Sequence, residues 1–488
     1  MTTAQTSTEM TRVEKDSMGE MTVPADVLYG ASTQRAVLNF PVSGRPVPET
    51  IIQAFALLKT AAANANFELG KLSETKRDRI VSACGQVFEG LEEHGGIERH
   101  FPIDIFQTGS GTSTNMNMNE VVANLVCIAN GVAIGSSKDK AYLETEPAIH
   151  PNDHVNMGQS SNDTFPTAMH IAAAIGIKDR LLPAVRSLAK ALENKAEAWD
   201  DVVKIGRTHL QDATPIRLGQ EFSGYASQLR HAEGRLERSL ETLAELAIGG
   251  TAVGTGINTH PDFSGLIAKE LTTRCGIEFR EADNHFEAQH AKDGYVEVSG
   301  MLRTIAVSMS KIANDIRWLG SGPRCGIGEL KLPAVQPGSS IMPGKVNPVI
   351  CEAVVMASCQ VVGNDAAITA GGFGGVGSLL DLNVAMPMMA ANLLDSIKLL
   401  TGSCEIFEDK LVKDLEPDRA RCEELIEGSL AMCTSLVPVI GYDASAKLAY
   451  AAYEQSKTVR ELALEQGDLD ANRLNELLDP SSMTHPSP

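Results

Sequence analysis

Gly338-Ser-Ser-Ile-Met-Pro-Gly-Lys-Val-Asn-Pro348 is the stretch around which this chain is organised. Its glycines and its proline predict an irregular loop, because glycine adopts backbone angles that are closed to other residues. Asn347 and Pro348 predict a helix start, with Asn347 as the N-cap, and the apolar run 349–362 supplies the helix. A lysine, an amide and the positive end of a helix dipole therefore lie within a few residues. Such a group predicts a site for a carboxylate or a phosphate, although a capped surface loop alone would look similar.

The composition is that of an ordinary folded protein with a strong negative charge. The chain has 488 residues, of which 43% are hydrophobic and 21% charged, and its formal net charge is −20. This charge argues against non-specific binding to nucleic acid or to an anionic membrane. An acidic protein that binds an anion must concentrate positive potential locally. We therefore expect lysine, histidine and helix N-termini to face one cleft.

The cysteines and the N-terminal segment indicate a compartment. Nine cysteines are scattered without any Cys-x-x-Cys pair, which predicts reduced thiols and provides no ligand set for zinc or an iron–sulfur cluster. Residues 1–20 are polar, are predicted to be disordered and lack the apolar core of a secretory signal. No uninterrupted apolar run reaches membrane-spanning length. The sequence therefore predicts a soluble, cytoplasmic protein.

Long periodic helices dominate the middle of the chain. Apolar residues recur at alternating four- and three-residue steps over 218–243 and 298–319, which predicts long helices packed nearly parallel. The stretches 164–200, 349–368 and 378–412 predict three more, so a five-helix bundle is expected. Helices with apolar residues on more than one face bury the surplus in an oligomer.

The other parts of the chain predict two smaller domains. We expect a mainly α protein with a mixed, mostly helical N-terminal domain over 1–159, the long bundle over 160–416 and a small helical C-terminal domain over 417–488. Within the first domain, a short strand or turn is predicted at 21–30, and the alanine-rich run 51–69 predicts a helix.

Three polar clusters follow one another before the first long helix: Gly109–Glu120, His150–Asp153 and Ser160–Thr164. Capping and local hydrogen bonds explain any one of them, and Ser161, Asn162 or Asp163 would cap a helix beginning near Thr164. Three in close succession, each short of apolar residues, predict a lined pocket instead.

A single histidine stands in the polar connection Arg207–Pro215, between the first two long helices. A lone loop histidine is most often a hydrogen-bonded surface residue. Histidine is also the side chain best suited to exchange protons near neutrality. Of the other motifs, Gly372–Gly377 fits G-x-G-x-x-G, but a helical run precedes it, which argues against dinucleotide binding.

The loop Gly-Ser-Ser-x-Met-Pro-x-Lys-x-Asn resembles the signature loop of the fumarase/aspartase superfamily, and its full wording resembles class II fumarases. The segments 206–215, 109–120 and 251–259 carry the same resemblance. It extends from about residue 12 to the C-terminal domain. His209 stands where aspartases generally have glutamine, which favours water chemistry over ammonia chemistry.

The resemblance implies a fold and a reaction. The fold is the three-domain superfamily architecture, assembled as a homotetramer with a twenty-helix core, in which three chains build each site. The reaction is reversible hydration of fumarate to L-malate, a step of the tricarboxylic acid cycle, with no metal and no organic cofactor. The partners are a small dicarboxylate and further copies of the chain, with no nucleic acid and no membrane. An aspartate ammonia-lyase and a catalytically silent structural relative are the alternatives.

The resemblance also implies residue roles. Ser339 is the base that takes the C3 proton, while His209, paired with Glu352, handles the water on the opposite side. The implied substrate-binding residues are Ser110, Thr112, Ser160, Ser161, Asn162, Thr208, Lys345 and Asn347. An accessory carboxylate site is implied at His150, Asn152 and Asp153. His154, where many fumarases have aspartate, and the insertion-like stretch 136–148 put that second site in doubt. Because Ser339 and His209 lie on different connections of long rods, we expect them at opposite ends of one subunit.

Overall fold

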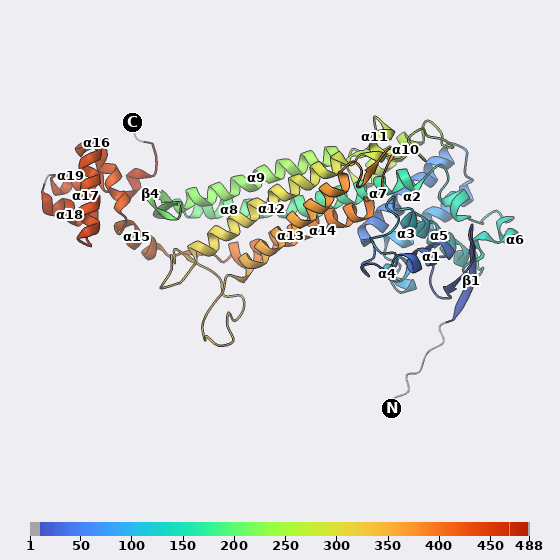
Figure 1. Ribbon diagram of the computed structural model, residues 1–488, viewed down its shortest axis with the longest axis horizontal. Coiled ribbons are helices and arrows are strands. Elements are labelled where there is room, and N and C mark those ends of the chain that lie inside the picture. The colour runs from blue at the N-terminus through green and yellow to red at the C-terminus, as the bar shows by residue number, and fades with distance from the viewer. Residues whose placement is uncertain (1–9, 468, 487–488) are drawn as a thin grey trace, which may run out of the picture. The chain divides into compact units, whose positions relative to one another are not determined.

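The computed structural model describes residues 10–467 and 469–486 and divides into two compact units (Figure 1). Unit 1 comprises Met1–Leu182, Arg235–Arg303 and Gln360–Leu399. Unit 2 comprises Pro183–Gly234, Thr304–Cys359 and Leu400–Pro488. Both units are therefore built from discontinuous segments. The three-domain division at 159/160 and 416/417 stays a prediction.

The expected mainly α architecture is confirmed, because helices predominate and the described strands pair only in twos. Four pairs are antiparallel, namely β1–β2, β3–β4, β7–β10 and β8–β9, and β5–β6 is parallel. The strands are β1 (Thr11–Asp16), β2 (Gly19–Pro24), β3 (Val203–Thr208), β4 (Gln211–Arg217), β5 (Glu245–Leu246), β6 (Arg280–Glu281), β7 (Leu330–Lys331), β8 (Ser378–Leu379), β9 (Leu382–Asn383) and β10 (Glu416–Pro417).

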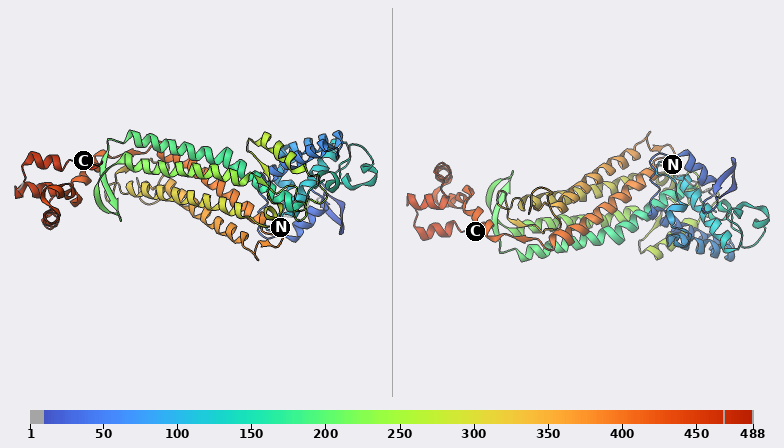
Figure 2. Two further views of the ribbon diagram at one scale, coloured as in Figure 1. Left: turned by 90° about the horizontal axis from the view of Figure 1, so that it is seen from above. Right: turned by 90° about the horizontal axis from the view of Figure 1, so that it is seen from below.

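The five predicted long helices are present, and each contributes a segment to both units. Figure 2 shows them alongside one another. Their apolar periodicity buries a continuous stripe, which explains why the pattern predicted them well. They are α7 (Ser161–Gly176) with its continuation η4 (Ile177–Leu181) and α8 (Leu182–Ala198), α9 (Leu218–Leu243), α12 (Asp293–Leu319), α13 (Val349–Gly372), and α14 (Met386–Phe407) with η5 (Glu408–Val412).

Shorter helices complete each unit. In unit 1, α2 (Glu49–Glu68) is buried along most of its length and contacts α3 (Glu74–Phe88), α7 and α10 (Phe263–Cys275). The further helices of unit 1 are α1 (Ala31–Asn39), α2 (Glu49–Glu68), α3 (Glu74–Phe88), α4 (Ile97–His100), α5 (Thr112–Ala129), α6 (Lys140–Leu143), α10 (Phe263–Cys275) and α11 (His285–His290). Those of unit 2 are α15 (Arg419–Glu427), α16 (Val437–Ile440), α17 (Tyr442–Glu454), α18 (Val459–Gln466) and α19 (Ala471–Leu477). Short 3-10 or π segments lie at Glu92–His94, Ser136–Lys138, Pro151–Val155, Leu430–Leu436 and Pro480–Met483.

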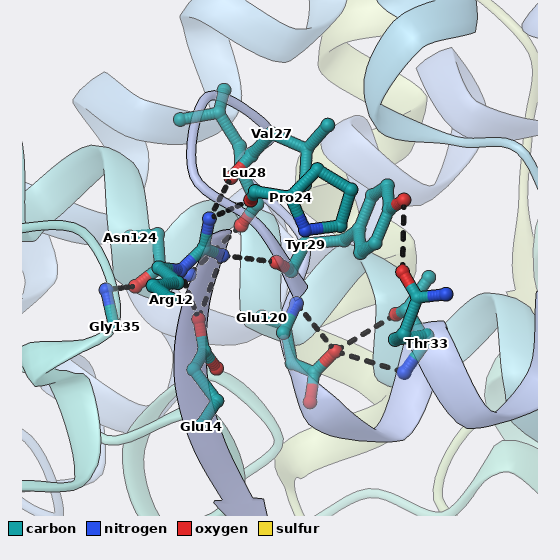
Figure 3. A network of polar contacts seen from close by, with 12 residues as sticks. Arg12, Glu14, Pro24, Val27, Leu28, Tyr29, Thr33, Glu120, Asn124 and Gly135 are labelled. Carbon is teal, nitrogen blue, oxygen red and sulfur yellow. Dashed lines mark hydrogen bonds and ion pairs between the residues drawn. The ribbon is translucent and has the colours of Figure 1, made fainter. Parts of the chain in front are cut away.

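The disorder predicted for residues 1–20 is wrong for 11–20, where β1 and β2 form a hairpin, while residues 1–9 lie outside the described part of the chain. Figure 3 shows the reason. The Arg12 guanidinium donates to the carbonyl oxygens of Val27, at 2.8 Å, and of Pro24 and Tyr29, and it pairs with Glu14. A single side chain with many donors thus fixes a polar segment that has little apolar surface to bury.

Glu120, which ends one of the sequence clusters, anchors the start of α1 (Figure 3). Its buried carboxylate accepts hydrogen bonds from the backbone N–H groups of Gly30, Ser32 and Thr33, at 2.9 to 3.1 Å, and from the Thr33 hydroxyl at 2.8 Å. These N–H groups have no partner within the helix, so a carboxylate there satisfies them and complements the helix dipole. Glu120 is therefore explained by structure alone.

Candidate active site

The loop from Gly338 to Asn347 is closed upon itself by two hydrogen bonds. The Gly338 N–H donates to the Lys345 carbonyl oxygen at 3.0 Å, and the Asn347 side-chain amide donates to the Gly338 carbonyl oxygen. A Cβ atom at Gly338 would lie 2.1 Å from the Lys345 carbonyl oxygen. Only glycine permits this approach, which explains why the loop begins with that residue.

The Ser339 hydroxyl oxygen lies under two backbone donors. It accepts hydrogen bonds from the N–H groups of Ile341, at 3.2 Å, and Met342, at 2.9 Å. Hydrogen bonds to an oxygen favour its negatively charged form. The backbone of the loop therefore stabilises the oxyanion that Ser339 would become on losing its proton.

The predicted role of Asn347 as helix cap needs correction. Helix α13 begins at Val349, one residue later than expected, and the Asn347 amide is engaged with the Gly338 carbonyl oxygen. Asn347 thus closes the loop, because its side chain reaches a carbonyl that the loop leaves without a helical partner. Glu352 lies in the first turn of α13, and the side chains of both Lys345 and Glu352 are exposed.

His209 lies at the tip of a β-hairpin, where the sequence suggested only a polar connection. Thr208 pairs with Gln211 across strands β3 and β4, so His209 and Leu210 form a two-residue turn. Both have positive φ, 57° and 59°, as a type I′ turn requires. Asparagine and glycine are the usual residues in such turns, so His209 and Leu210 occupy a strained conformation.

The expectation that His209 and Ser339 lie at opposite ends of a subunit is wrong, because both belong to unit 2. The chain passes from unit 1 into unit 2 along α8 and again along α12, so the hairpin after α8 and the loop between α12 and α13 both lie in unit 2. Among the described residues, neither a hydrogen bond nor an ion pair joins His209 to Glu352, although the resemblance implies that they pair.

In unit 1, hydroxyl groups from two sequence clusters form a chain. The Ser110 and Thr112 hydroxyl oxygens lie 2.7 Å apart, and Thr112 is 2.7 Å from the Ser161 hydroxyl. Gly111, which lies between them, has φ +72°, and a Cβ there would lie 2.0 Å from the Phe165 ring. The absence of a side chain at Gly111 therefore lets the first cluster approach the second, while the pocket lined by all three clusters stays a prediction.

The second cluster caps α7 at Ser160, which corrects the predicted start near Thr164. The Ser160 hydroxyl accepts a hydrogen bond from the Asn162 N–H at 3.2 Å, and the Ser160 N–H donates to the Asp163 carboxylate at 2.9 Å. This arrangement is a capping box, and it begins the helix at Ser161. The Asn162 amide donates to the Ala252 carbonyl oxygen at 2.8 Å, so the segment 251–259 also joins this cluster.

Asp163 is the buried centre of this arrangement. Its carboxylate also accepts hydrogen bonds from the N–H groups of Gly249, at 3.0 Å, and Thr251, at 2.9 Å. Burial raises the pKa of Asp163 to about 6, and the N–H donors of Ser160, Thr251 and Gly249 act in the opposite direction. Asp163 thereby fixes the α7 N-terminus against the loop that follows β5.

Asp163→Asn is expected to lower the free energy of unfolding by about 1 to 3 kcal/mol. The Asp163 carboxylate is the acceptor in all of its hydrogen bonds. The asparagine amide would turn an NH₂ group towards one of the backbone N–H donors, so at least one buried N–H group would lose its partner. Urea denaturation at fixed protein concentration measures the change. Asp283→Asn, at an exposed carboxylate of the same unit, is the control and should leave the midpoint unchanged. Equal midpoints for Asp163→Asn and the wild type would contradict this account.

Lys59 was not singled out in the sequence, yet it lies buried behind the same cluster. Its ammonium donates to the side-chain oxygens of Asn115, Asn156 and Gln159 at 2.8, 2.9 and 3.0 Å. Burial lowers the pKa of Lys59 to about 7, and the nearby Asp163 carboxylate acts in the opposite direction. The only signal in the sequence is a lysine within an otherwise small and apolar helix.

The three residues of the implied accessory site lie together at the segment Pro151–Val155. The His150 Nδ1 atom accepts a hydrogen bond from the Asp153 N–H at 3.1 Å, and the Asp153 carboxylate lies 3.2 Å from Nδ1. Asn152 and Asp153 are exposed. His154, the departure noted in the sequence, accepts a hydrogen bond from the His150 N–H at 2.8 Å, and its Nε2 lies 3.0 Å from the Lys76 ammonium. Among the described residues, no hydrogen bond links this segment to the hydroxyl groups of Ser110, Thr112 and Ser161.

The structure thus sorts the predicted residues into two groups. Unit 1 holds the polar groups suited to carboxylate and hydroxyl recognition: Ser110, Thr112, Ser160, Ser161 and Asn162. Unit 2 holds the groups suited to proton transfer and charge stabilisation: Thr208, His209, Ser339, Lys345, Asn347 and Glu352.

Comparison with known proteins identifies the family to which the chain belongs. Residues 19–363 match the family described as Lyase, and residues 432–485 match the family described as Fumarase C C-terminus. The helical fold and the two groups of site residues therefore belong to a lyase.

The relatives are more specific. The chain is 49% identical to a fumarate hydratase class II of Neisseria meningitidis, over 98% of this chain and 99% of that one, and 50% identical to one of Halobacterium salinarum, over 97% of each. The crystal structure of a class II fumarase from Schistosoma mansoni matches with a TM-score of 0.91 at 40% identity, covering 98% of this chain and 100% of that one. A fumarate lyase:delta crystallin from Brucella melitensis matches with a TM-score of 0.90 at 42% identity, with the same coverage. The chain belongs to the class II fumarate hydratase family.

Proposed function

We propose that this protein catalyses the reversible hydration of fumarate to L-malate. The observation that carries the proposal is the Ser339 hydroxyl, held under two backbone N–H donors in a loop that also presents Lys345. The names of the relatives and the presence of His209 support the same reaction. The substrate is a small dicarboxylate, and the enzyme works in the cytoplasm without nucleic acid or membrane.

The chemical difficulty lies in removing a proton from the carbon beside a carboxylate, which leaves a dianionic aci-carboxylate. In the direction of dehydration, Ser339 takes the C3 proton of malate, and the backbone donors of Ile341 and Met342 stabilise its oxyanion. The Lys345 ammonium and the α13 N-terminus face the charge that develops on the carboxylate. Donors fixed before the charge appears are each worth about 10²- to 10³-fold in rate.

The remaining residues bind and orient the substrate. Ser110, Thr112, Ser160, Ser161, Thr208 and Asn162 offer hydroxyl and amide groups to its carboxylates and hydroxyl. Asn347 contributes through its hold on Gly338, which keeps the loop closed. His209, with Glu352, accepts the proton of the attacking water in the hydration direction and returns it to the leaving hydroxyl in dehydration. His150, Asn152 and Asp153 form a second carboxylate site in this proposal.

We also infer that the working enzyme is a homotetramer. Helix α13 is the one described helix that is long and apolar enough to cross a membrane by length and composition, yet only 33% of its most apolar window is buried. Its exposed side chains include Met356, at 67%, and Val362, at 43%. An apolar helix with this exposure requires a cover, and the corresponding helices of further copies supply one.

Purified protein should form fumarate from L-malate and should not do so from L-aspartate. The reason is His209, which can exchange the proton of a water molecule or hydroxyl. Fumarate formation is followed by its ultraviolet absorbance, with and without a chelator, and the chelator should have no effect. Faster turnover of aspartate would establish the ammonia-lyase alternative, and no turnover of either would establish a silent structural relative.

A further inference from the structure

A cluster of four charged side chains lies next to the His209 hairpin, within unit 2, and two of them, Lys204 and Glu329, are buried. Glu329 is its centre and is completely buried. The Arg207 guanidinium donates to both oxygens of Glu329, at 2.8 and 3.1 Å, and the ammonium of Lys204 lies 3.3 Å from the same carboxylate. Lys204 also lies 3.2 Å from Glu221, so two cations face two carboxylates.

Burying the charges of Glu329 and Lys204 costs several kcal/mol per ion, which the attraction to their partners offsets only when the geometry is good. An apolar core of the same volume would stabilise the fold at least as well. The cluster is therefore poorly explained by stability alone. Its distinctive property is geometric, because two parallel N–H···O bonds between Arg207 and Glu329 fix the direction as well as the distance of the contact.

The direction of the contact between Arg207 and Glu329 affects the nearby turn of the hairpin, where His209 lies. Arg207 precedes His209 by two residues on β3, and the register of β3 and β4 shifts by a bulge between Ile205 and Arg207. His209 and Leu210 then hold positive φ values. Such strained residues persist only where the surrounding structure over-determines them. The paired Arg207 side chain, two residues before His209, supplies that constraint.

Glu329 is fixed from its other side through the backbone. Its carbonyl oxygen accepts a hydrogen bond from the Asp418 N–H at 2.8 Å, and the next residue, Leu330, pairs with Pro417 across β7 and β10. The chain then runs from β7 into the loop that carries Ser339. Glu329 thus holds the His209 hairpin close to its turn and also fixes the start of the segment that leads to the Ser339 loop.

We propose that Glu329 is a positioning residue, whose buried carboxylate fixes the orientation of the His209 hairpin through Arg207. The inference rests on the proposed function for its effect on turnover, but the fixing of the hairpin is a separate property that exchange measurements detect. Glu329 is completely buried, so it acts on the hairpin through its contact with Arg207 rather than by touching the substrate.

Glu329→Gln tests the proposal in the full-length protein. Glutamine keeps the shape of the side chain but has only one oxygen to accept the two hydrogen bonds from the Arg207 guanidinium. The hairpin should therefore loosen. We expect kcat for fumarate hydration to fall about 100-fold, the loss that follows a misplacement of about 1 Å, while KM changes little. Amide hydrogen exchange over 203–217 should become faster. The matched control is Glu221→Gln, which removes the other carboxylate of the cluster and leaves the Arg207 fork intact. Both kcat and exchange should then stay near the wild-type values.

Two further variants separate positioning from stability. The double variant Arg207→Met with Glu329→Gln removes the Arg207 cation that Glu329→Gln leaves without its carboxylate, while Lys204 keeps its pairing with Glu221. Its melting temperature should therefore recover relative to Glu329→Gln, while its kcat stays low. If Glu329→Gln does not fold, Glu329→Asp keeps the charge but retracts the carboxylate by one methylene, and kcat of the folded protein should still fall.

The proposal is overturned if Glu329→Gln, or in its place a folded Glu329→Asp, retains wild-type kcat. Equal losses in Glu221→Gln and Glu329→Gln, or recovery of kcat together with melting temperature in the double variant, would also overturn it. Wild-type protein that turns over neither malate nor fumarate would refute the proposed function instead. The exchange rates of the hairpin would then still decide whether Glu329 fixes it.

Discussion

Ser339→Ala should lower kcat for malate dehydration by about 10²- to 10⁴-fold, the range that one general acid or base contributes. The hydroxyl oxygen of Ser339 is the acceptor of two backbone hydrogen bonds, from Ile341 and Met342, which no other side chain of the loop shares. Alanine removes the base and leaves the Gly338 to Asn347 ties untouched. The affinity for fumarate, measured by calorimetry, should therefore change little, because Lys345 and the unit 1 hydroxyl groups remain.

Ser340→Ala is the matched control, because it removes a hydroxyl from the adjacent, exposed residue of the same loop. Its kcat should stay within about twofold of the wild-type value, as surface substitutions usually change energies by less than 0.5 kcal/mol. A folded Ser339→Ala protein with near-normal kcat would show that another group is the base, and His209 would be the first to examine. Parallel loss in Ser340→Ala would indicate damage to the loop rather than loss of a base.

The long helices were predictable because each one buries a stripe of apolar residues that recurs along its own sequence. The run from Leu218 to Leu243 predicted α9 to the residue. Periodicity is local information, and so the sequence alone contains it. The start of α7 was placed three residues too late, because Ser160, Ser161, Asn162 and Asp163 are all good caps. Only the capping box in the structure decides among them.

The two hairpins were missed for a different reason. Residues 11–20 are polar, and their order comes from Arg12, whose carbonyl partners reach to Tyr29. The His209 turn lacks the asparagine and glycine that ordinarily announce a type I′ turn, because its strain is held by contacts elsewhere. In both hairpins, part of the constraint comes from residues outside the segment that it orders.

Part of the candidate site was predictable, namely the residues that carry the family motifs. Its buried supports were not, since a buried charge is recognised by partners that are distant in the sequence. Glu329 and Arg207 are separated by 122 positions, and Lys59 reaches Gln159 across 100 positions. Single residues such as these give no pattern, whereas the fold brings their partners within 3 Å or so of one another.

If each active site is assembled from several chains, mixing two inactive variants should restore a large part of the activity. The implied pair of His209 and Glu352 is not formed between described residues of one chain, and both side chains are exposed. Helix α13, which carries Glu352 in its first turn, also presents the apolar surface that a further copy would cover. We therefore expect Ser339 and Glu352 of one chain to face His209 of another.

Ser339→Ala and His209→Asn proteins, each inactive alone, should regain activity when they are unfolded together and reassembled. A working site then takes Ser339 from a His209→Asn chain and His209 from a Ser339→Ala chain. Random assortment of equal amounts in a symmetric tetramer makes about a quarter of the sites intact, so about a quarter of wild-type activity should return. Mixing Ser339→Ala with a chain that carries both Ser339→Ala and His209→Asn is the control, since no chain then supplies Ser339. If each site were contained in one chain, every site in the mixture would lack one of the two residues. Verified mixed tetramers as inactive as their parents would therefore refute a site shared between subunits.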